Sequence, residues 1–199
     1  MDIGKNFVYF GKFDKIDEVK KILKDNEDTF FKKKSVRETL PEQRETRIEL
    51  CIHNVLKGID GIIDRKKTDI FLPLVLNAIK KVEKKYGYKY SVVRGLNIVK
   101  LKEGGKILEH IDSNGYYPFL HRIHLPIVTN ENCIFKVGKE KKHLKEGNIY
   151  EINNCIEHSV ENNGESRVHI VIDLLGIGSR IPRDLNENLL KEFYSREVQ

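Results

Sequence analysis

The stretch GLNIVKLKEGGKILEHID, residues 95–112, alternates apolar and polar residues on both sides of a turn. The segment EGGK, residues 103–106, supplies the turn, and the alternation then resumes up to His110 and Asp112. Short strands of this kind, separated by turn signals, continue from about residue 88 onward. The pattern predicts a mainly β fold with flanking helices, whose core is a double-stranded β-helix, or jelly roll.

His110 and Asp112 end this stretch with one residue between them. On a strand, side chains two residues apart project from the same face, about 7 Å apart at Cα, so both could reach one ion. On a helix the same spacing would place them roughly 200° apart. A histidine and a carboxylate are part of the ligand set of mononuclear non-haem Fe(II) sites. The pair alone is equally consistent with a solvated strand end.

A second cluster lies in residues 156–175, where two alternating segments flank the dipeptide NG at residues 163–164. Asn-Gly is a strong signal for a two-residue hairpin turn. In that register His158 would face His169, and Arg167 would lie diagonal to His158 on the same face. A guanidinium there can hold a carboxylate through two parallel hydrogen bonds, which an ammonium cannot do. The alternative is an ordinary hydrogen-bonded histidine in a hairpin.

The segment HRIHLPI, residues 121–127, alternates in the same way, so Arg122 and His124 share a face. A buried arginine is costly unless an anion pairs with it. The pair therefore indicates anion binding inside a barrel. The alternative interpretation is a surface arginine on an edge strand beside a satisfied core histidine.

Composition is that of an ordinary intracellular enzyme. The chain has 199 residues, of which 39% are hydrophobic, enough for one core, so we expect a single domain over residues 1–199. Within it we expect a mixed, partly helical support region at 1–88, the jelly-roll catalytic core at 89–178 and a C-terminal helix at 180–199. No apolar run reaches membrane-span length and no signal peptide is evident. Three widely spaced cysteines fit reduced thiols, so we expect a cytoplasmic protein.

The balance of charge is basic, with 36 Lys and Arg against 30 Asp and Glu, a net charge of +6. Short lysine runs account for much of the excess, and such runs are usually solvated faces of helices and loops. No nucleic-acid motif with interleaved aromatic residues accompanies them. A nucleic-acid partner is therefore not favoured.

Helical periodicity marks two segments that precede the predicted core. Residues 17–25 form one predicted helix, and a longer one is expected from Thr68 or Asp69 to a stop at Gly87. Pro73 would then fall near the first turn, where proline is tolerated. Such helices would pack on the outer face of the barrel.

Three other segments carry less specific predictions. Residues 32–47 are charged and irregular, which is typical of a loop. Residues 113–119, which include Tyr116 and Tyr117, suit a lid over substrate or, equally, an aromatic-anchored surface loop. Residues 184–196 have the periodicity of the expected C-terminal helix.

The chain resembles the aspartyl/asparaginyl β-hydroxylase family of Fe(II)/2-oxoglutarate-dependent oxygenases. The resemblance is specific in the combination and order of its segments rather than in any single motif. It rests on LKEGGKILEHID (101–112), RIHLP (122–126), FKVG (135–138), LKEGNIYEINNCIEHSVEN (144–162) and RVHIVID (167–173).

The resemblance implies a metal site in which His110 and His158 are ligands. Some family members, including the animal peptidyl hydroxylases, have no acidic ligand where Asp112 stands. This chain keeps the full His-Asp-His set, as do relatives that hydroxylate free amino acids such as proline. A peptidyl Asp or Asn substrate therefore does not follow from the resemblance, whereas oxygenase chemistry does.

The resemblance also implies the remaining site residues and the reaction. The arginine that binds 2-oxoglutarate falls on Arg167, and His124 joins it at the cosubstrate. Arg122 would contact substrate. If residues 113–119 form a lid, Tyr116 and Tyr117 would join it there. Fe(II), 2-oxoglutarate and O2 would then serve to hydroxylate a C–H bond in the side chain of an amino acid or peptide, releasing succinate and CO2.

Two other classes remain open from the sequence. A nucleic-acid or nucleobase demethylase would use the same iron core, but that branch typically carries a second arginine six residues after the first, where Asp173 stands here. A non-enzymatic jelly-roll metal-binding protein is the third possibility, and the intact ligand set with Arg167 disfavours it. The oligomeric state does not follow from the sequence.

Overall fold

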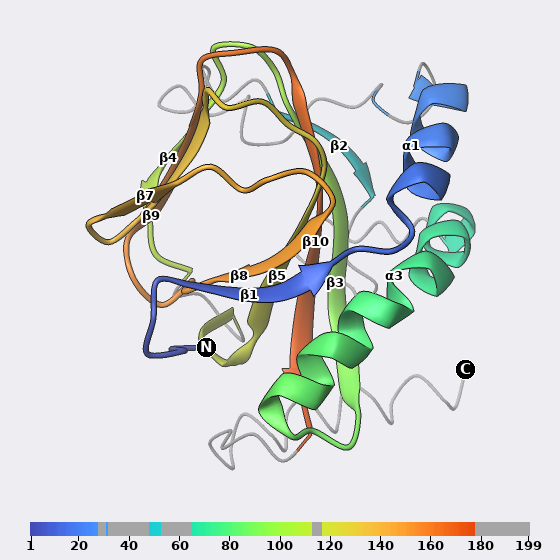
Figure 1. Cartoon of the computed structure of the whole chain (residues 1–199), viewed down its shortest axis with the longest axis vertical. Helices are drawn as coiled ribbons and strands as arrows, with labels where there is room; N and C mark the ends of the chain where they lie inside the picture. Colours follow the sequence, from blue (N-terminus) through green and yellow to red (C-terminus); the bar gives the residue numbers. More distant parts are fainter. Residues whose placement is uncertain (28–30, 32–47, 53–64, 113–116, 178–199) are drawn as a thin grey trace.

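The computed structural model describes residues 1–27, 31, 48–52, 65–112 and 117–177. Two antiparallel sheets face each other, and helices cover the outer side of the larger one, as Figure 1 shows. The predicted mainly β fold with flanking helices and a jelly-roll core is confirmed. No helix within these ranges is both long and apolar enough to cross a membrane.

Ten strands are distributed over the two sheets in the described residues. The order in the larger sheet is β1-β8-β5-β10-β3-β2, and in the smaller sheet it is β4-β9-β6-β7. The larger sheet contains β1 (Phe7–Lys12), β2 (Ile48–Ile52), β3 (Ser91–Leu101), β5 (His121–Val128), β8 (Asn148–Ile152) and β10 (Arg167–Gly176). The smaller contains β4 (Lys106–His110), β6 (Cys133–Val137), β7 (Glu140–Lys142) and β9 (His158–Asn162).

Two apolar cores lie on the two faces of the larger sheet. One core packs the sheet against helices α1 (Ile16–Asp25) and α3 (Arg65–Tyr86). In α3, Phe71, Val75 and neighbouring apolar residues recur at helical spacing and are fully buried against strand residues. Burying one such side chain contributes about 1.5–3 kcal/mol. The other core fills the space between the sheets.

The predicted helix at residues 17–25 agrees with α1 to within one residue. The longer helix begins at Arg65 instead of at Thr68 or Asp69, because the preceding residues are good helix formers and extend it. Pro73 therefore lies inside α3 and not near its first turn. The expected loop at 32–47 and the C-terminal helix lie outside the described residues.

The predicted hairpin between residues 156–161 and 166–175 is wrong. Strand β9 pairs with β4 and β6 in the smaller sheet, whereas β10 pairs with β3 and β5 in the larger one. The Asn-Gly dipeptide therefore lies in a connection that passes from one sheet to the other. Local turn chemistry suggested a hairpin, but partners distant in the sequence satisfy the backbone groups of both strands.

The expected division at residue 88 does not separate the sheets. Strands β1 and β2, which come from the N-terminal support region, form the two edges of the larger sheet. β1 pairs with β8 and β2 pairs with β3. The single-domain organisation stays a prediction, but the support region contributes strands as well as helices to the fold.

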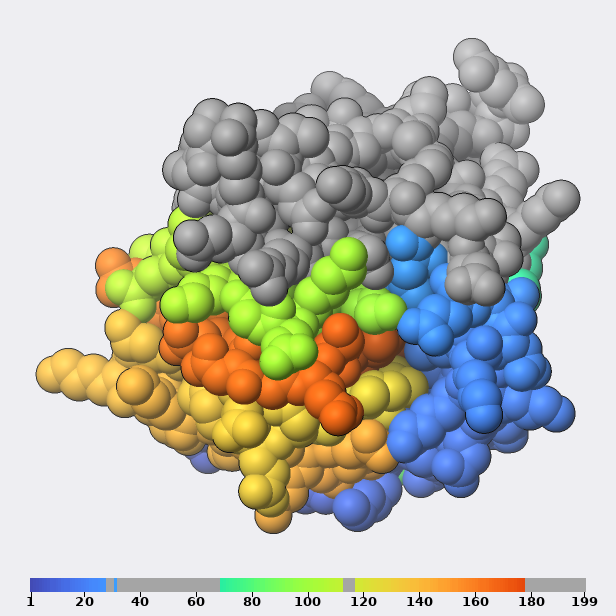
Figure 2. All heavy atoms as spheres, turned by 90° about the horizontal axis from the view of Figure 1, so that it is seen from above, coloured from blue at the N-terminus to red at the C-terminus, as the bar shows by residue number. Residues whose placement is uncertain are grey.

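One end of the jelly roll is closed by turns joined around Asn162. This side chain is fully buried, and its amide group lies 3.1 Å from the carbonyl oxygens of Leu101 and Lys102 and 2.9 Å from that of Glu165. Asn130 donates a hydrogen bond to the Asn162 side-chain oxygen. Figure 2 shows the green, yellow and orange atoms of these turns packed against one another. Since Asn162 ends β9 and His158 begins it, the candidate site lies at the opposite end.

Candidate active site

His110 and His158 are cross-strand partners in the smaller sheet, with ring centroids 4.3 Å apart. Each ring is oriented by its own backbone. Nδ1 of His110 lies 2.7 Å from the carbonyl oxygen of Leu108, and Nδ1 of His158 lies 2.9 Å from that of Ile156. If each Nδ1 carries the proton and donates to that carbonyl, each Nε2 presents its lone pair. Burial lowers the pKa of His158, which favours the neutral ring that a metal needs.

Asp112 follows β4, and its carboxylate faces Nε2 of both imidazoles. Its Oδ1 is 3.6 Å from Nε2 of His110, and its Oδ2 is 3.7 Å from Nε2 of His158. Its backbone N–H donates a hydrogen bond of 3.1 Å to the carbonyl oxygen of Asn154, which fixes the backbone just beyond the strand. The candidate ligand atoms of these two histidines and Asp112 all lie within 4.8 Å of one another. Two imidazoles and one carboxylate so placed fit an Fe(II) ion with open positions.

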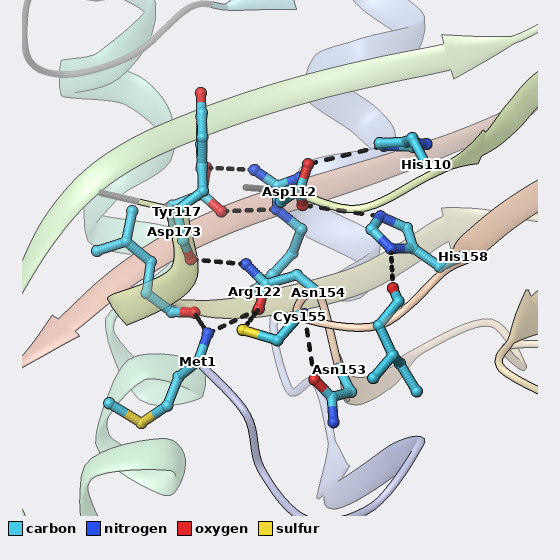
Figure 3. Close-up of polar contacts among 12 residues, drawn as sticks. Met1, His110, Asp112, Tyr117, Arg122, Asn153, Asn154, Cys155, His158 and Asp173 are labelled. Carbon is cyan, nitrogen blue, oxygen red and sulfur yellow. Dashed lines mark hydrogen bonds and ion pairs between the residues drawn. The ribbon is translucent and has the colours of Figure 1, made fainter. Parts of the chain in front are cut away.

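Arg122 is already paired with two carboxylates (Figure 3). Its Nε and Nη2 donate to the two oxygens of Asp173, at 2.8 and 3.2 Å, and its Nη1 donates to Oδ2 of Asp112. The ring of Tyr117 covers the guanidinium, whose central carbon lies 4.9 Å from the ring centroid. Burial alone would lower the pKa of Arg122, but Asp173 and Asp112 outweigh it and raise the pKa.

Deeper in the interior, Arg167 is 1% exposed and forms no ion pair with a carboxylate in the described part of the protein. Its Nε and Nη1 are buried without hydrogen-bond partners among these residues, as are both ring nitrogens of His124 and of His169. Phe135 packs against all three side chains. The Arg167 guanidinium carbon is 5.6 Å from the Phe135 centroid, and the His169 ring stacks on Phe135 at 5.5 Å.

The interior cluster of Arg167, His124 and His169 holds a buried cation, and none of the three side chains supplies a counter-charge. Burial lowers the pKa of Arg167, and burial followed by the charge of Arg167 lowers the pKa of both His124 and His169 well below 6.5. The histidines are therefore neutral and supply no anion. A buried cation without a counter-charge is costly, as are buried polar atoms without partners. A bound anion with several acceptor oxygens would remove both costs.

The structure thus brings the expected residues into two groups. His110, Asp112 and His158 lie at the open end with Arg122 and Tyr117, whereas Tyr116 lies outside the described residues. The cosubstrate candidates Arg167 and His124 lie inside the barrel. The sequence reasoning did not identify the contacts of Asp173 and Phe135. Asp173 follows Arg167 and His169 at even spacing on one strand, so the period-2 rule could have placed it on the same inner face.

Solved structures with the same architecture define the class of fold. The non-haem α-ketoglutarate-dependent epimerase SnoN from nogalamycin biosynthesis has a TM-score of 0.59 at 14% identity, over 86% of this chain and 78% of that one. A prolyl hydroxylase from Trichoplax adhaerens, bound to a peptide fragment, has a TM-score of 0.58 at 11% identity, over 88% and 86%. A 2OG-Fe(II) oxygenase family oxidoreductase from Burkholderia pseudomallei has a TM-score of 0.56 at 14% identity, over 70% and 73%. The fold is that of the 2-oxoglutarate- and Fe(II)-dependent oxygenases.

A sequence model of the family described as aspartyl/asparaginyl beta-hydroxylase matches residues 64–176, more than half of the chain. The chain therefore belongs to the aspartyl/asparaginyl β-hydroxylase family, and it is a 2-oxoglutarate-dependent oxygenase. The resemblance seen in the sequence is confirmed. A search of curated proteins finds no match. Membership implies Fe(II) and 2-oxoglutarate as cofactor and cosubstrate.

Proposed function

We propose that this enzyme hydroxylates a C–H bond in the side chain of an amino acid or peptide and converts 2-oxoglutarate to succinate and CO2. The observation that carries the proposal is the uncompensated, buried Arg167 behind a His-Asp-His group. A metal centre alone would not need this cation, and a structural arginine would have a carboxylate partner. A dicarboxylate that reaches from the metal to Arg167 accounts for the His-Asp-His group and for the buried arginine together.

His110, Asp112 and His158 are the proposed metal ligands. Their ligand atoms converge, and each Nδ1 lies within hydrogen-bond distance of a backbone carbonyl, which favours the tautomer with Nε2 free. Three protein ligands leave positions for the cosubstrate and O2. Bound iron would supply the redox chemistry, while the protein orients the reactants and excludes water.

Arg167 is the proposed partner of the far carboxylate of 2-oxoglutarate. Its planar guanidinium offers two parallel donors to a carboxylate, and its unpartnered Nε and Nη1 are available for them. His124 lies in the same cluster, and its buried ring nitrogens could donate a further hydrogen bond to the cosubstrate. Both side chains are buried, and the low local dielectric strengthens such contacts.

The substrate is expected on the open side of the metal site, where Arg122, Tyr117 and Tyr116 are the proposed contacts. Tyr117 lies over the guanidinium of Arg122 and belongs to the short helix η3 (Tyr117–Phe119). The positive charge of Arg122 is already balanced by Asp112 and Asp173. A substrate carboxylate would therefore share this arginine with Asp112 and Asp173 instead of meeting an unpaired cation.

Succinate formation tests the proposal. The purified protein is incubated with Fe(II), ascorbate, O2 and 2-oxoglutarate, with panels of free amino acids and of short peptides. We expect slow succinate formation without substrate and a marked stimulation by one panel, with a product heavier by one oxygen atom. His158→Ala should abolish both, whereas the surface substitution Lys141→Gln should change neither. Succinate formation that survives in His158→Ala, or that is absent from the wild type, would overturn the proposal.

A further inference from the structure

Asp173 and Arg122 form a fixed unit on the inner face of the larger sheet. They are directly opposed partners on the neighbouring strands β10 and β5. Asp173 accepts hydrogen bonds from Nε and Nη2, so it holds the guanidinium along one edge. The Asp173 side chain is 2% exposed and that of Arg122 is 15% exposed. A two-point contact in such a buried place fixes the plane of the guanidinium as well as its position.

The remaining edge of the guanidinium points at Asp112. Nη1 donates to Oδ2 of Asp112, which also lies 3.7 Å from Nε2 of His158. Oδ1 of the same carboxylate lies 3.6 Å from Nε2 of His110 and accepts no hydrogen bond from Arg122. Figure 3 shows the three side chains in one row, from Asp173 through Arg122 to Asp112. Asp112 lies beyond the end of β4, so no strand pairing holds it directly. Its orientation therefore depends on Arg122 and on the backbone bond to Asn154.

We propose that Asp173 is a positioning residue that acts through Arg122 to hold Asp112 with a single oxygen directed at the metal. This inference rests on the proposed ligand set of His110, Asp112 and His158. The Arg122 guanidinium uses one lone pair of Oδ2, which leaves Oδ1 as the better donor to a metal. The coordination positions needed by 2-oxoglutarate and O2 then stay open.

Asp173 also balances the charge of Arg122. Without Asp173, Arg122 would keep Asp112 as its carboxylate partner, so it would compete with the divalent metal for that carboxylate. With Asp173 present, the guanidinium is held in place and its charge is shared between two carboxylates. Removing such an outer partner of a metal ligand typically costs about 10–100-fold in metal affinity.

The test is a titration of the metal-free protein with Co(II) or Mn(II), in the absence of 2-oxoglutarate, followed by calorimetry. The variants are Asp173→Asn, Arg122→Gln and the double variant. Asp173→Asn keeps the shape and removes the charge, and we expect metal affinity to fall about 10–100-fold. In the Arg122→Gln background the same substitution should have little further effect, because Asp173 acts through Arg122.

Glu109→Gln is the matched control, since it makes the same chemical change in an exposed ion pair, with Lys136, on the same strand as His110. It should leave metal affinity unchanged. Thermal unfolding of the metal-free variants separates positioning from folding. If Asp173→Asn does not fold, Arg122→Lys keeps the charge without the two-point contact and should show the loss of affinity.

The outcomes separate this inference from the proposed function. Metal binding by the wild type that is lost in His158→Ala supports the ligand set. Unchanged affinity in Asp173→Asn, or an equal loss with and without Arg122, would then overturn the role of Asp173 alone. A wild-type protein that binds neither metal would overturn both.

Discussion

Arg167 on β10 and Phe135 on β6 join the two sheets across the interior, with the guanidinium carbon 5.6 Å from the ring centroid. His169 stacks on the same ring with an interplanar angle of 5°. The aromatic face supports the cation without neutralising it, because a ring quadrupole supplies no formal charge. Arg167 is thereby held ready for an anion.

Replacement of Arg167 by Ala should weaken 2-oxoglutarate binding by about 2–5 kcal/mol, or tens to thousands of fold. Arg167→Lys should restore only part of this, because an ammonium provides a charge without the paired donors. Titration of 2-oxoglutarate into the Fe(II) protein without O2, followed by its metal-to-ligand absorption band, measures the effect. Metal affinity should be nearly unchanged, since Arg167 contributes no ligand atom. Wild-type affinity for 2-oxoglutarate in Arg167→Ala would refute the assignment.

Asp112→Ala should abolish 2-oxoglutarate turnover, because the site loses its charged ligand. Asp173 still holds Arg122 in this variant, so the fold should be retained. Turnover is measured as succinate, and folding by circular dichroism of the metal-free protein. Activity close to that of the wild type would show that His110 and His158 suffice, as in family members without the acidic ligand.

Metal binding should stabilise the wild type but not His158→Ala. A ligand that binds only the folded state adds about 2.7 kcal/mol at a concentration 100 times its Kd. Thermal unfolding with and without Mn(II), in chelator-treated samples, gives the shift in Tm. Lys141→Gln serves as a control that should retain the full shift. An equal shift in His158→Ala would mean that the ion binds elsewhere.

The stability of the metal-free protein should fall below pH 6.5. Burial, followed by the charge of Arg167, lowers the pKa of His124 and His169 in the folded state. Once unfolded, both histidines take up protons near pH 6.5, so their contribution is complete above that pH and is lost as the pH falls below it. Each histidine can change the free energy of unfolding by about 1.4 kcal/mol per pH unit in this range.

Urea unfolding between pH 7.5 and 5.5, with a chelator present, tests this dependence. His169→Asn should reduce the slope of the free energy of unfolding against pH, because the new side chain does not titrate. Phe135→Leu changes the neighbouring packing without removing a titratable group, so it should lower stability and leave the slope intact. A slope in His169→Asn equal to that of the wild type would contradict the expectation.

The sequence was sufficient to predict the strand character of the core and the convergence of His110, Asp112 and His158. For His110 and Asp112 the two-residue spacing predicted a shared face. The structure brings them together, although β4 ends at His110 and Asp112 lies just beyond it. The pairing of strands was not predictable in the same way. The Asn-Gly signal between His158 and Arg167 suggested a hairpin, but the two strands pair with segments distant in the sequence. Non-local register depends on packing that no short window contains.

The contacts of Arg122 likewise depend on a strand pairing that the sequence did not predict. The alternation at residues 121–127 correctly placed Arg122 and His124 on one inner face. It could not reveal that β5 and β10 are neighbours, and this neighbour relationship is what places Asp173 opposite Arg122. The need of a buried arginine for an anion was visible in the sequence, but its partners within the protein were not.

The two sheets hold opposite ends of the proposed cosubstrate site. His110 and His158 belong to the smaller sheet, whereas Arg167 belongs to the larger one. If 2-oxoglutarate bridges them as proposed, the separation of the sheets, which side chains such as Phe135 and Val160 help to set, limits the length of the acid that reaches both ends. Smaller or larger side chains at these positions would then favour a 2-oxo diacid that is longer or shorter by one carbon. The selectivity for the cosubstrate would thus depend on residues of the interior core.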